Sequence, residues 1–285
     1  MTSTDGFLLV DKPAGITSHD AVSVVRRATG QARVGHTGTL DPFATGLLLM
    51  LVGRGTRLAR FVSSEPKTYD ALVAFGRETT TDDATGDTRC EAELPRAASI
   101  PDAIARLTGE IQQIPPVYSA KHVAGKRAYS MARRGVAVQL HPVTVRVHEW
   151  CVGALTNGVL RVSIVCAGGT YVRALARDLG RLTGSAAHLA ALRRTRAGAF
   201  DVANAVTLDA VRAGDFNLCP LRDVVSDLPV EQLTERATVE ASHGRTVAAT
   251  ITASRAALIG NEGTLVAVAE CENGAWRPRV VLVGA

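Results

Sequence analysis

Gly35-His36-Thr37-Gly38-Thr39-Leu40-Asp41-Pro42-Phe43-Ala44-Thr45-Gly46 is a stretch with three glycines and one acidic residue, Asp41, just before an apolar run. An Asp followed by Pro is an ordinary signal for a turn or a helix start. The glycines and His36 favour a second interpretation, because glycine lets the backbone approach a ligand closely or adopt conformations barred to other residues. We therefore select Asp41 as the candidate catalytic residue and keep the plain turn as the alternative.

The composition is typical of a soluble, globular protein. The chain has 285 residues, 46% of them hydrophobic, which is enough for a packed core and favours two domains. No apolar run approaches the roughly 18 residues of a membrane span, and the first residues lack the basic and apolar parts of a secretory signal. We expect a cytoplasmic protein with no membrane partner. The five cysteines form no Cys-x-x-Cys pair, so we expect neither a disulfide framework nor a metal site.

Positive charge is concentrated in the first part of the chain. The net charge is +5, while residues 228–285 hold five arginines and six acidic residues. The stretch from Ser119 to Arg146 contains six basic residues and no acidic one. A solvated surface usually mixes both signs, so this imbalance, with Tyr118 and Tyr129 nearby, indicates contact with nucleic-acid phosphates.

Hydrophobic periodicity predicts alternating strands and helices over residues 1–227. We expect strands at Phe7–Val10, Leu47–Val52, Lys67–Gly76, Val143–His148 and Val159–Cys166. We expect one helix from Ser18 to a stop at Gly30, one that begins near Val172, and others at Arg57–Val62, Pro101–Thr108 and Ala186–Leu192. The segment Glu78–Pro95 is predicted to be a surface loop. The last two of the strands should pair around the turn Asn157-Gly158. From about Leu228 the pattern changes to short Val-rich strands, which predicts a small β-barrel-like tail.

Two further positions allow a structural and a functional interpretation. Tyr69, at the start of a predicted strand, suits the edge of a core or a ligand contact. Arg173, Arg177 and Arg181 recur every four residues on a predicted helix, which describes a solvated basic stripe. Alternatively, Arg173, in the first turn after Gly168-Gly169, binds an anion at the helix N-terminus.

Taken together, these segments resemble the TruB-type tRNA pseudouridine synthases. The resemblance extends over most of residues 7–200 and rests on the motifs Phe7–Gly15, Gly35–Gly46, Lys67-Thr68-Tyr69, Thr81–Gly86, Pro115–Ala120 and Gly169–Arg173. The loop His-Thr-Gly-x-Leu-Asp-Pro-x-Ala-x-Gly carries most of its specificity.

The resemblance implies a fold, a partner and a set of site residues. The fold would be α/β (α+β), with a central mixed, largely antiparallel sheet flanked by helices. Residues 1–227 would form the catalytic domain, with an RNA-gripping insertion at about 118–142, and residues 228–285 a PUA-like RNA-binding domain. The substrate would be uridine 55 in the T-stem-loop of tRNA, bound by a monomer. The implied roles are catalysis by Asp41, Tyr69 and Arg173, substrate binding by His36, Tyr69, Tyr171 and Leu192, and RNA contact by Lys12, Lys121, Lys126, Arg127, Arg133 and Arg134.

The chemistry of such an isomerisation agrees with a lone carboxylate. The bond from ribose C1′ to uracil N1 is replaced by a bond from C1′ to C5, without net redox change, so we expect no cofactor and no metal. A hydrolase acting on glycosidic bonds would need paired carboxylates, and a non-catalytic RNA-binding protein would not need Asp41. Asp82 and Asp83 are the nearest candidates for a second acid, and we expect them in a polar surface segment.

Overall fold

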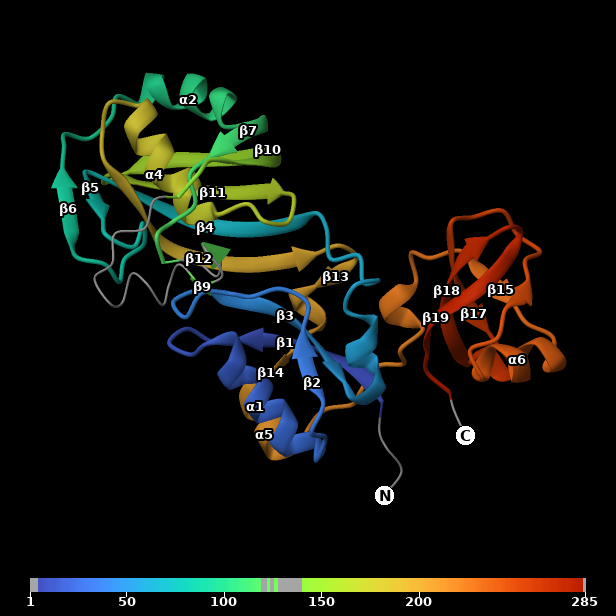
Figure 1. Ribbon diagram of the computed structural model, residues 1–285. Helices are drawn as coiled ribbons and strands as arrows, with labels where there is room; N and C mark the ends of the chain where they lie inside the picture. Colours follow the sequence, from blue (N-terminus) through green and yellow to red (C-terminus); the bar gives the residue numbers. More distant parts are fainter. Residues whose placement is uncertain (1–4, 119–121, 124–125, 128–139, 284–285) are drawn as a thin grey trace. The chain divides into compact units, whose positions relative to one another are not determined.

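The computed structural model describes residues 5–118, 122–123, 126–127 and 140–283 (Figure 1). The chain divides into two compact units. The first contains Met1–Asp41, Leu48–Ser63 and Asn204–Ala285, and the second contains Pro42–Leu47 and Ser64–Ala203. The chain passes from one unit to the other directly after Asp41, and it returns within strand β3 (Thr45–Val52).

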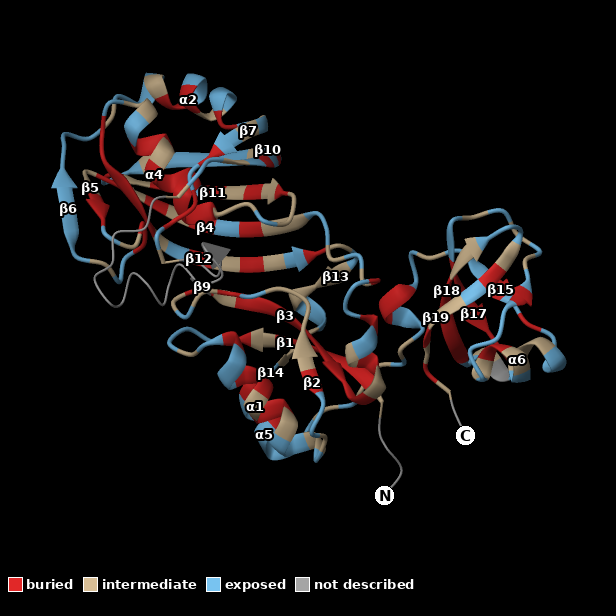
Figure 2. Ribbon diagram, viewed as in Figure 1, coloured by how far each residue is buried: buried red, intermediate tan, exposed pale blue. Residues whose placement is uncertain are grey.

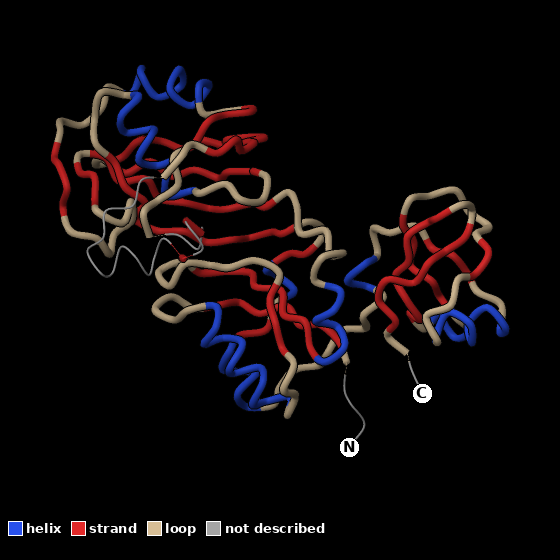
Figure 3. The backbone as a smooth tube through the Cα atoms, viewed as in Figure 1, coloured by secondary structure: helices blue, strands red, loops and turns tan. Residues whose placement is uncertain are grey.

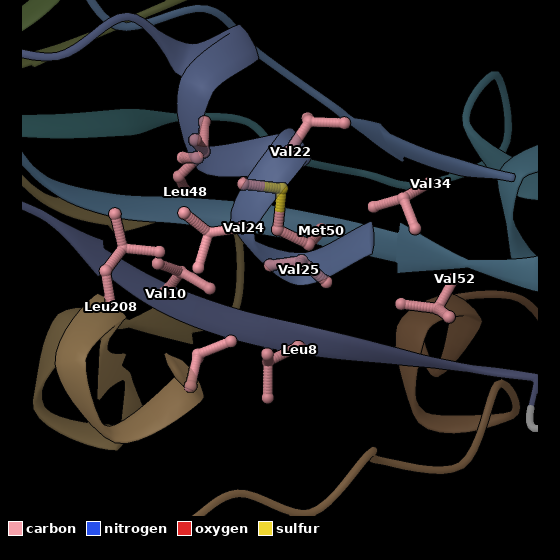
Figure 4. Packing of buried hydrophobic residues seen from close by; sticks show 12 residues of the cluster. Leu8, Val10, Val22, Val24, Val25, Val34, Leu48, Met50, Val52 and Leu208 are labelled. Carbon is pink, nitrogen blue, oxygen red and sulfur yellow. The ribbon is translucent and has the colours of Figure 1, made fainter. Parts of the chain in front are cut away.

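In the first unit, helix α1 (Ser18–Thr29) packs on strands β1 (Gly6–Lys12) and β3. Figure 4 shows the valines of α1 beside Leu8, Val10 and Met50. Strand β2 (Val34–His36) pairs antiparallel with β3, and β1 pairs parallel with β14 (Val206–Thr207). The core is completed by α5 (Leu208–Ala213), and the 3₁₀ segment η1 (Gly53–Leu58) follows β3.

The start of α1 differs slightly from the prediction. Thr17, not Ser18, is the N-cap: its side chain accepts a hydrogen bond from the backbone of Asp20 at 3.0 Å, and the carboxylate of Asp20 accepts one from the Thr17 backbone. This reciprocal capping box satisfies two backbone N–H groups that the first helical turn leaves unpaired. Gly30 ends the helix as predicted, with φ +64°. The predicted helix at Arg57–Val62 is instead the 3₁₀ segment η1, which begins and ends earlier.

The second unit is built on long antiparallel strands, seen as the red tubes in Figure 3. Its strand order is β12-β4-β11-β10-β7. The strands of this order are β4 (Lys67–Phe75), β7 (Gly109–Gln113), β10 (Val143–Thr156), β11 (Val159–Cys166) and β12 (Ala187–Ala197). The helices are α2 (Ile100–Arg106) and α4 (Val172–Leu182). The short strands are β5 (Arg77–Thr79), β6 (Thr88–Glu91), β8 (His122–Val123), β9 (Lys126–Arg127) and β13 (Phe200–Asp201). The predicted hairpin around Asn157-Gly158 is confirmed, because β10 and β11 pair antiparallel.

Two predictions in this unit are wrong. The segment Ala186–Leu192 is not a helix: from Ala187 on it belongs to β12, which pairs along most of its length with β4. Ladder pairing with a distant strand outweighs the helix preference of alanine and leucine here. The segment Glu78–Pro95 is also not simply a surface loop. It contains Glu78 and Thr79 of β5 and the whole of β6, which is exposed (pale blue in Figure 2). Glu78, Asp82 and Asp83 are buried.

The C-terminal part of the first unit has a sheet of its own, as the Val-rich pattern predicted. Its strand order is β15-β17-β18-β19-β16. The elements are β15 (Val230–Gln232), α6 (Glu235–Ser242), β16 (Val247–Ala248), β17 (Arg255–Ile259), β18 (Leu265–Glu272) and β19 (Ala275–Val281). Trp276 is fully buried in the core of this sheet, and its indole donates a hydrogen bond at 2.7 Å to the buried carboxylate of Glu231. A domain boundary at residues 227/228 stays a prediction.

The described helices are too short or too polar to cross a membrane.

Candidate active site

Asp41 follows a segment whose backbone is fixed by a buried serine. The Ser18 hydroxyl donates to the carbonyl of Leu40 at 3.0 Å and accepts from the Leu40 backbone N–H at 2.9 Å. Leu40 itself is buried, and Asp41 is half-buried in non-helical backbone just before a turn at Pro42 and Phe43. The first residue of α1 therefore holds the position from which Asp41 extends. No pattern along the chain indicates this role of Ser18.

His36 lies at the end of β2, where it is the Cα partner of Met50. It is half-buried, in the same unit as Asp41. The stretch from β2 to Asp41 is thus anchored at both ends, by the ladder with β3 and by Ser18.

The C-terminal end of the stretch Gly35–Gly46 is anchored in the second unit. Gly46 is the Cα partner of Arg194 on β12, and its φ of +103° is a conformation that side chains disfavour. A Cβ added at Gly46 would lie 2.2 Å from the carbonyl oxygen of Arg194. The Arg194 side chain is buried, and its Nε donates to the carbonyl of Leu47 at 2.7 Å. Only glycine allows β3 to begin this close to β12.

Tyr69 and Leu192 lie on one buried face of the second unit's sheet. Tyr69, on β4, is the Cα partner of Arg194 on β12 and of Ile164 on β11. Leu192, on β12, is the Cα partner of Ala71 on β4. Side chains of directly opposed residues point to the same face of a sheet. Side chains two positions apart along one strand also share a face. Tyr69 and Leu192 are therefore diagonal neighbours, each 8% exposed. The structure brings these two predicted residues together.

Lys67 shares this face with Tyr69, two positions earlier on β4. Burial, followed by the positive charge of Arg194, lowers the pKa of Lys67 below its ordinary value, and Glu65 opposes this shift. Its partner across β11, Cys166, is fully buried, and burial raises the pKa of that thiol to about 11. Both groups therefore favour their uncharged forms more than they would in water.

Tyr171 and Arg173 lie at the N-terminal end of α4. Tyr171 is the half-buried N-cap residue, and its backbone is held by the side chain of Gln113. Arg173 is 4% exposed and donates to the carbonyls of Thr81 and Tyr118, both at 2.9 Å. Its guanidinium also lies 3.5 Å from the carboxylate of Asp83. Arg173 belongs to the second unit and Asp41 to the first.

The three arginines spaced along α4 do not form a uniformly solvated stripe, because Arg173 and Arg177 are buried while Arg181 is exposed. Each is paired with an acid of the segment Glu78–Asp83: Arg173 with Asp83 at 3.5 Å, Arg177 with Asp82 at 2.8 Å and Arg181 with Glu78 at 2.6 Å. This corrects the expectation that Asp82 and Asp83 lie on a polar surface, because both are buried and each faces a guanidinium. These acids are committed to ion pairs, which does not favour them as the second acid of a carboxylate pair.

The predicted RNA-contact residues have different outcomes. Lys12 is fully buried, and its ammonium donates to the carbonyls of Pro13 and Ile16 at 2.8 and 2.9 Å. In this structure the Lys12 ammonium therefore helps to hold the turn after β1, and the phosphate contact expected of this residue stays a prediction. Lys126 and Arg127 form the short strand β9, whose side chains are not described, and Lys121, Arg133 and Arg134 lie outside the described residues.

Within the described ranges, no group of three or more His, Cys, Asp or Glu side chains is arranged to hold a metal ion.

Comparison with known proteins identifies the fold and then the family. The structure is similar to that of a Cbf5-Nop10-Gar1 complex (TM-score 0.72, 23% identity, 98% of this chain and 85% of the other) and to an archaeal box H/ACA sRNP Nop10-Cbf5 complex (TM-score 0.72, 22% identity, 98% and 86%). These likenesses establish the pseudouridine synthase fold, and the predicted class, a mixed and largely antiparallel sheet with helices and a C-terminal β region, is confirmed.

The sequence matches the description "TruB family pseudouridylate synthase (N terminal domain)" over residues 26–172 and "tRNA pseudouridylate synthase B C-terminal domain" over residues 173–234. It is 42% identical to the tRNA pseudouridine synthase B of Thermobifida fusca, over 98% of this chain and 99% of that protein. Identity to the protein of the same name from Aromatoleum aromaticum is 41%, over 96% and 92%. The chain belongs to the TruB family of pseudouridine synthases. It is therefore an enzyme, an isomerase, and the family predicted from the sequence motifs is confirmed.

Proposed function

We propose that this enzyme converts uridine 55 in the T-loop of tRNA into pseudouridine, with Asp41 as the nucleophile. The observation that carries the proposal is the family match over nearly the whole chain. It is combined with the anchoring of the backbone on both sides of Asp41, by Ser18 at Leu40 and by the pairing of Gly46 with Arg194. The relatives are named for action on tRNA, and the acid-free basic stretch from Ser119 to Arg146 suits an RNA backbone. We further propose a monomer that acts in the cytoplasm, where tRNA is found.

In the proposed reaction the target nucleotide leaves its stack and its base lies against the face formed by Tyr69 and Leu192. Unstacking costs a few kcal/mol, which stacking on an aromatic ring offsets. His36 and Tyr171 contact the same nucleotide. The fixed place of Tyr69 between β11 and β12 supports this role. Leu192 supplies apolar surface next to the ring.

Asp41 forms a covalent bond to the nucleotide, either at C6 of the uracil or at C1′ of the ribose, and this bond is broken again before the product leaves. The C1′–N1 bond is cleaved, the base rotates, the C1′–C5 bond forms, and the proton at C5 is lost to a base while N1 gains one. We assign Tyr69 to the transfer of the C5 proton and Arg173 to the pairing that keeps Asp41 ionised. A guanidinium beside a carboxylate favours its charged form.

Replacement of Asp41 by Asn tests the nucleophile. We expect Asp41→Asn to release no tritium from tRNA labelled at C5 of uridine, while the dissociation constant for tRNA changes less than about threefold, because the amide keeps the shape but not the nucleophilic oxygen. Asp70→Asn is the matched control, since Asp70 is exposed on β4 and points away from the face of Tyr69. Normal turnover by Asp41→Asn would overturn the assignment.

The target position is tested separately. Mapping pseudouridine in total RNA with and without the gene should show loss at position 55 of tRNA. Loss only in another RNA class would leave the enzyme a pseudouridine synthase but refute tRNA as its substrate.

A charge-removal series tests the basic segment. Neutralising Lys126, Arg127, Arg133 and Arg134 should weaken tRNA binding and reduce the slope of log K against log salt by about 0.7–0.9 for each phosphate that the protein no longer neutralises. An unchanged slope would exclude this segment from phosphate binding.

A further inference from the structure

Gln113 is a fully buried polar residue at the end of β7. A buried amide is costly unless both its donor and its acceptor are hydrogen-bonded. Both are used on one residue: Nε2 donates to the carbonyl of Tyr171 at 3.1 Å, and Oε1 accepts from the backbone N–H of Tyr171 at 2.9 Å. The side chain thus replaces a strand partner for the backbone of Tyr171. The primary amide of Gln113 supplies this donor and this acceptor from one planar group.

The residue that Gln113 holds is the entry to α4. Tyr171 is the N-cap of this helix, with extended backbone (φ −98°, ψ 104°) and no hydrogen bond from its own side chain to the first turn. Its carbonyl also accepts from the backbone N–H of Leu175 at 3.1 Å. Gln113 therefore fixes the direction in which the chain enters α4. Both the ring of Tyr171 and the first-turn residue Arg173 extend from this point.

Gln113 is also the last residue of β7, and it is the Cα partner of Val143, the first residue of β10. Directly after Gln113, the carbonyls of Ile114 and Tyr118 accept hydrogen bonds from Arg177 and Arg173, both at 2.9 Å. Residues 113–118 are thus joined at three points to the N-cap and the first half of α4. Among these three, the Gln113 contact is the one made by a side chain of residues 113–118.

We propose that Gln113 is a positioning residue of the uridine site, which holds the backbone of Tyr171 and so sets the placement of Tyr171 and Arg173 for the reaction. This inference rests on the proposed function. Misplacement of a reacting group by about 1 Å costs roughly a hundredfold in rate, whereas RNA binding is spread over many contacts. Gln113 therefore acts on the chemical step more than on binding.

The test compares Gln113 with its neighbour in the same strand. Gln112 is exposed, and its amide donates to the hydroxyl of Thr144 at 2.8 Å, so Gln112→Leu and Gln112→Glu are matched controls. Single-turnover pseudouridine formation on a T-stem-loop RNA and the dissociation constant for the same RNA are measured for each variant. We expect Gln113→Leu to be slowed roughly a hundredfold and Gln113→Glu, whose carboxylate when ionised keeps the acceptor but not the donor, roughly tenfold, with less than a threefold change in binding. Both controls should match the wild type.

The outcomes separate the two proposals. Wild-type protein that forms no pseudouridine in the T-stem-loop refutes the proposed function. An active wild type with Gln113 variants as fast as the Gln112 variants refutes the positioning role. A loss confined to RNA affinity, or loss of the folded far-UV circular dichroism in both Gln113 variants, also refutes it, because either would make Gln113 a binding or a purely structural residue.

Discussion

The buried ion pair between Arg177 and Asp82 provides the sharpest test of the packing of α4. Both side chains are 7% exposed, and Nη1 of Arg177 lies 2.8 Å from Oδ2 of Asp82. Burial raises the pKa of Asp82, and the guanidiniums of Arg177 and Arg173 oppose that rise. Arg177→Met leaves a buried carboxylate without its nearest partner. It also removes the hydrogen bond from Arg177 to the carbonyl of Ile114.

The expected cost follows from these contacts. Removing one partner of a buried ion pair costs about 3–5 kcal/mol, because the remaining charge stays desolvated. In the double variant Arg177→Met/Asp82→Asn no buried charge of this pair is left, so we expect it to be more stable than Arg177→Met alone by at least about 1 kcal/mol. Asn suits position 82, whose φ is +61°.

Hydrogen exchange measured peptide by peptide is the suitable assay, because it reports the opening of each part of the chain. In Arg177→Met, amides of β4 and β12 should exchange about two to four powers of ten faster, which corresponds to 3–5 kcal/mol. Amides of the C-terminal sheet should not change. Arg212→Met is the control, since Arg212 pairs with Asp209 on the surface of α5, with exposures of 53% and 89%, and its loss should cost no more than about 0.5 kcal/mol. A cost below about 1 kcal/mol for Arg177→Met, or additive single costs, would refute the reasoning.

Three further predictions concern other parts of the chain. Gly46→Ala should abolish soluble folding or activity, because the new methyl would lie 2.2 Å from the Arg194 carbonyl oxygen. Soluble expression and turnover measure this effect. A fully active variant would contradict the register of β3 and β12. Burial raises the pKa of the Glu231 carboxylate, but hydrogen bonds from the side chains and backbone around it outweigh burial and lower the pKa below the ordinary 4.5. The stability that Glu231 contributes is therefore present above pH 4.5 and is lost as the pH falls further. The melting temperature of Glu231→Gln should therefore be lower at pH 7 by an amount that shrinks at low pH, and a pH-independent difference would contradict this. Iodoacetamide at pH 8 should label the exposed Cys90 and not Cys166, whose thiol has a pKa of about 11, as read by mass spectrometry of the native protein; equal labelling would refute the burial of Cys166.

The sequence by itself determined the family, the candidate nucleophile and much of the secondary structure. The Asp41 stretch, Lys67-Thr68-Tyr69 and Gly169–Arg173 are local motifs, so they are readable without any knowledge of distant contacts. Alternation in Val143–His148 and Val159–Cys166 predicted the hairpin for the same reason, because a tight turn joins the two strands.

Only the tertiary structure decided the roles that depend on partners far away in the chain. Asp82 and Asp83 have the composition of a surface loop and become buried because arginines about 90 residues later reach them. The segment Ala186–Leu192 has helical composition and becomes a strand because β4 supplies a ladder. Gln113 looks like one more polar residue of a short strand until the chain returns 58 residues later and places Tyr171 against it. A pattern along the chain shows which groups are apolar or charged, but the free energy of burying a polar group depends on the partner that the fold brings to it.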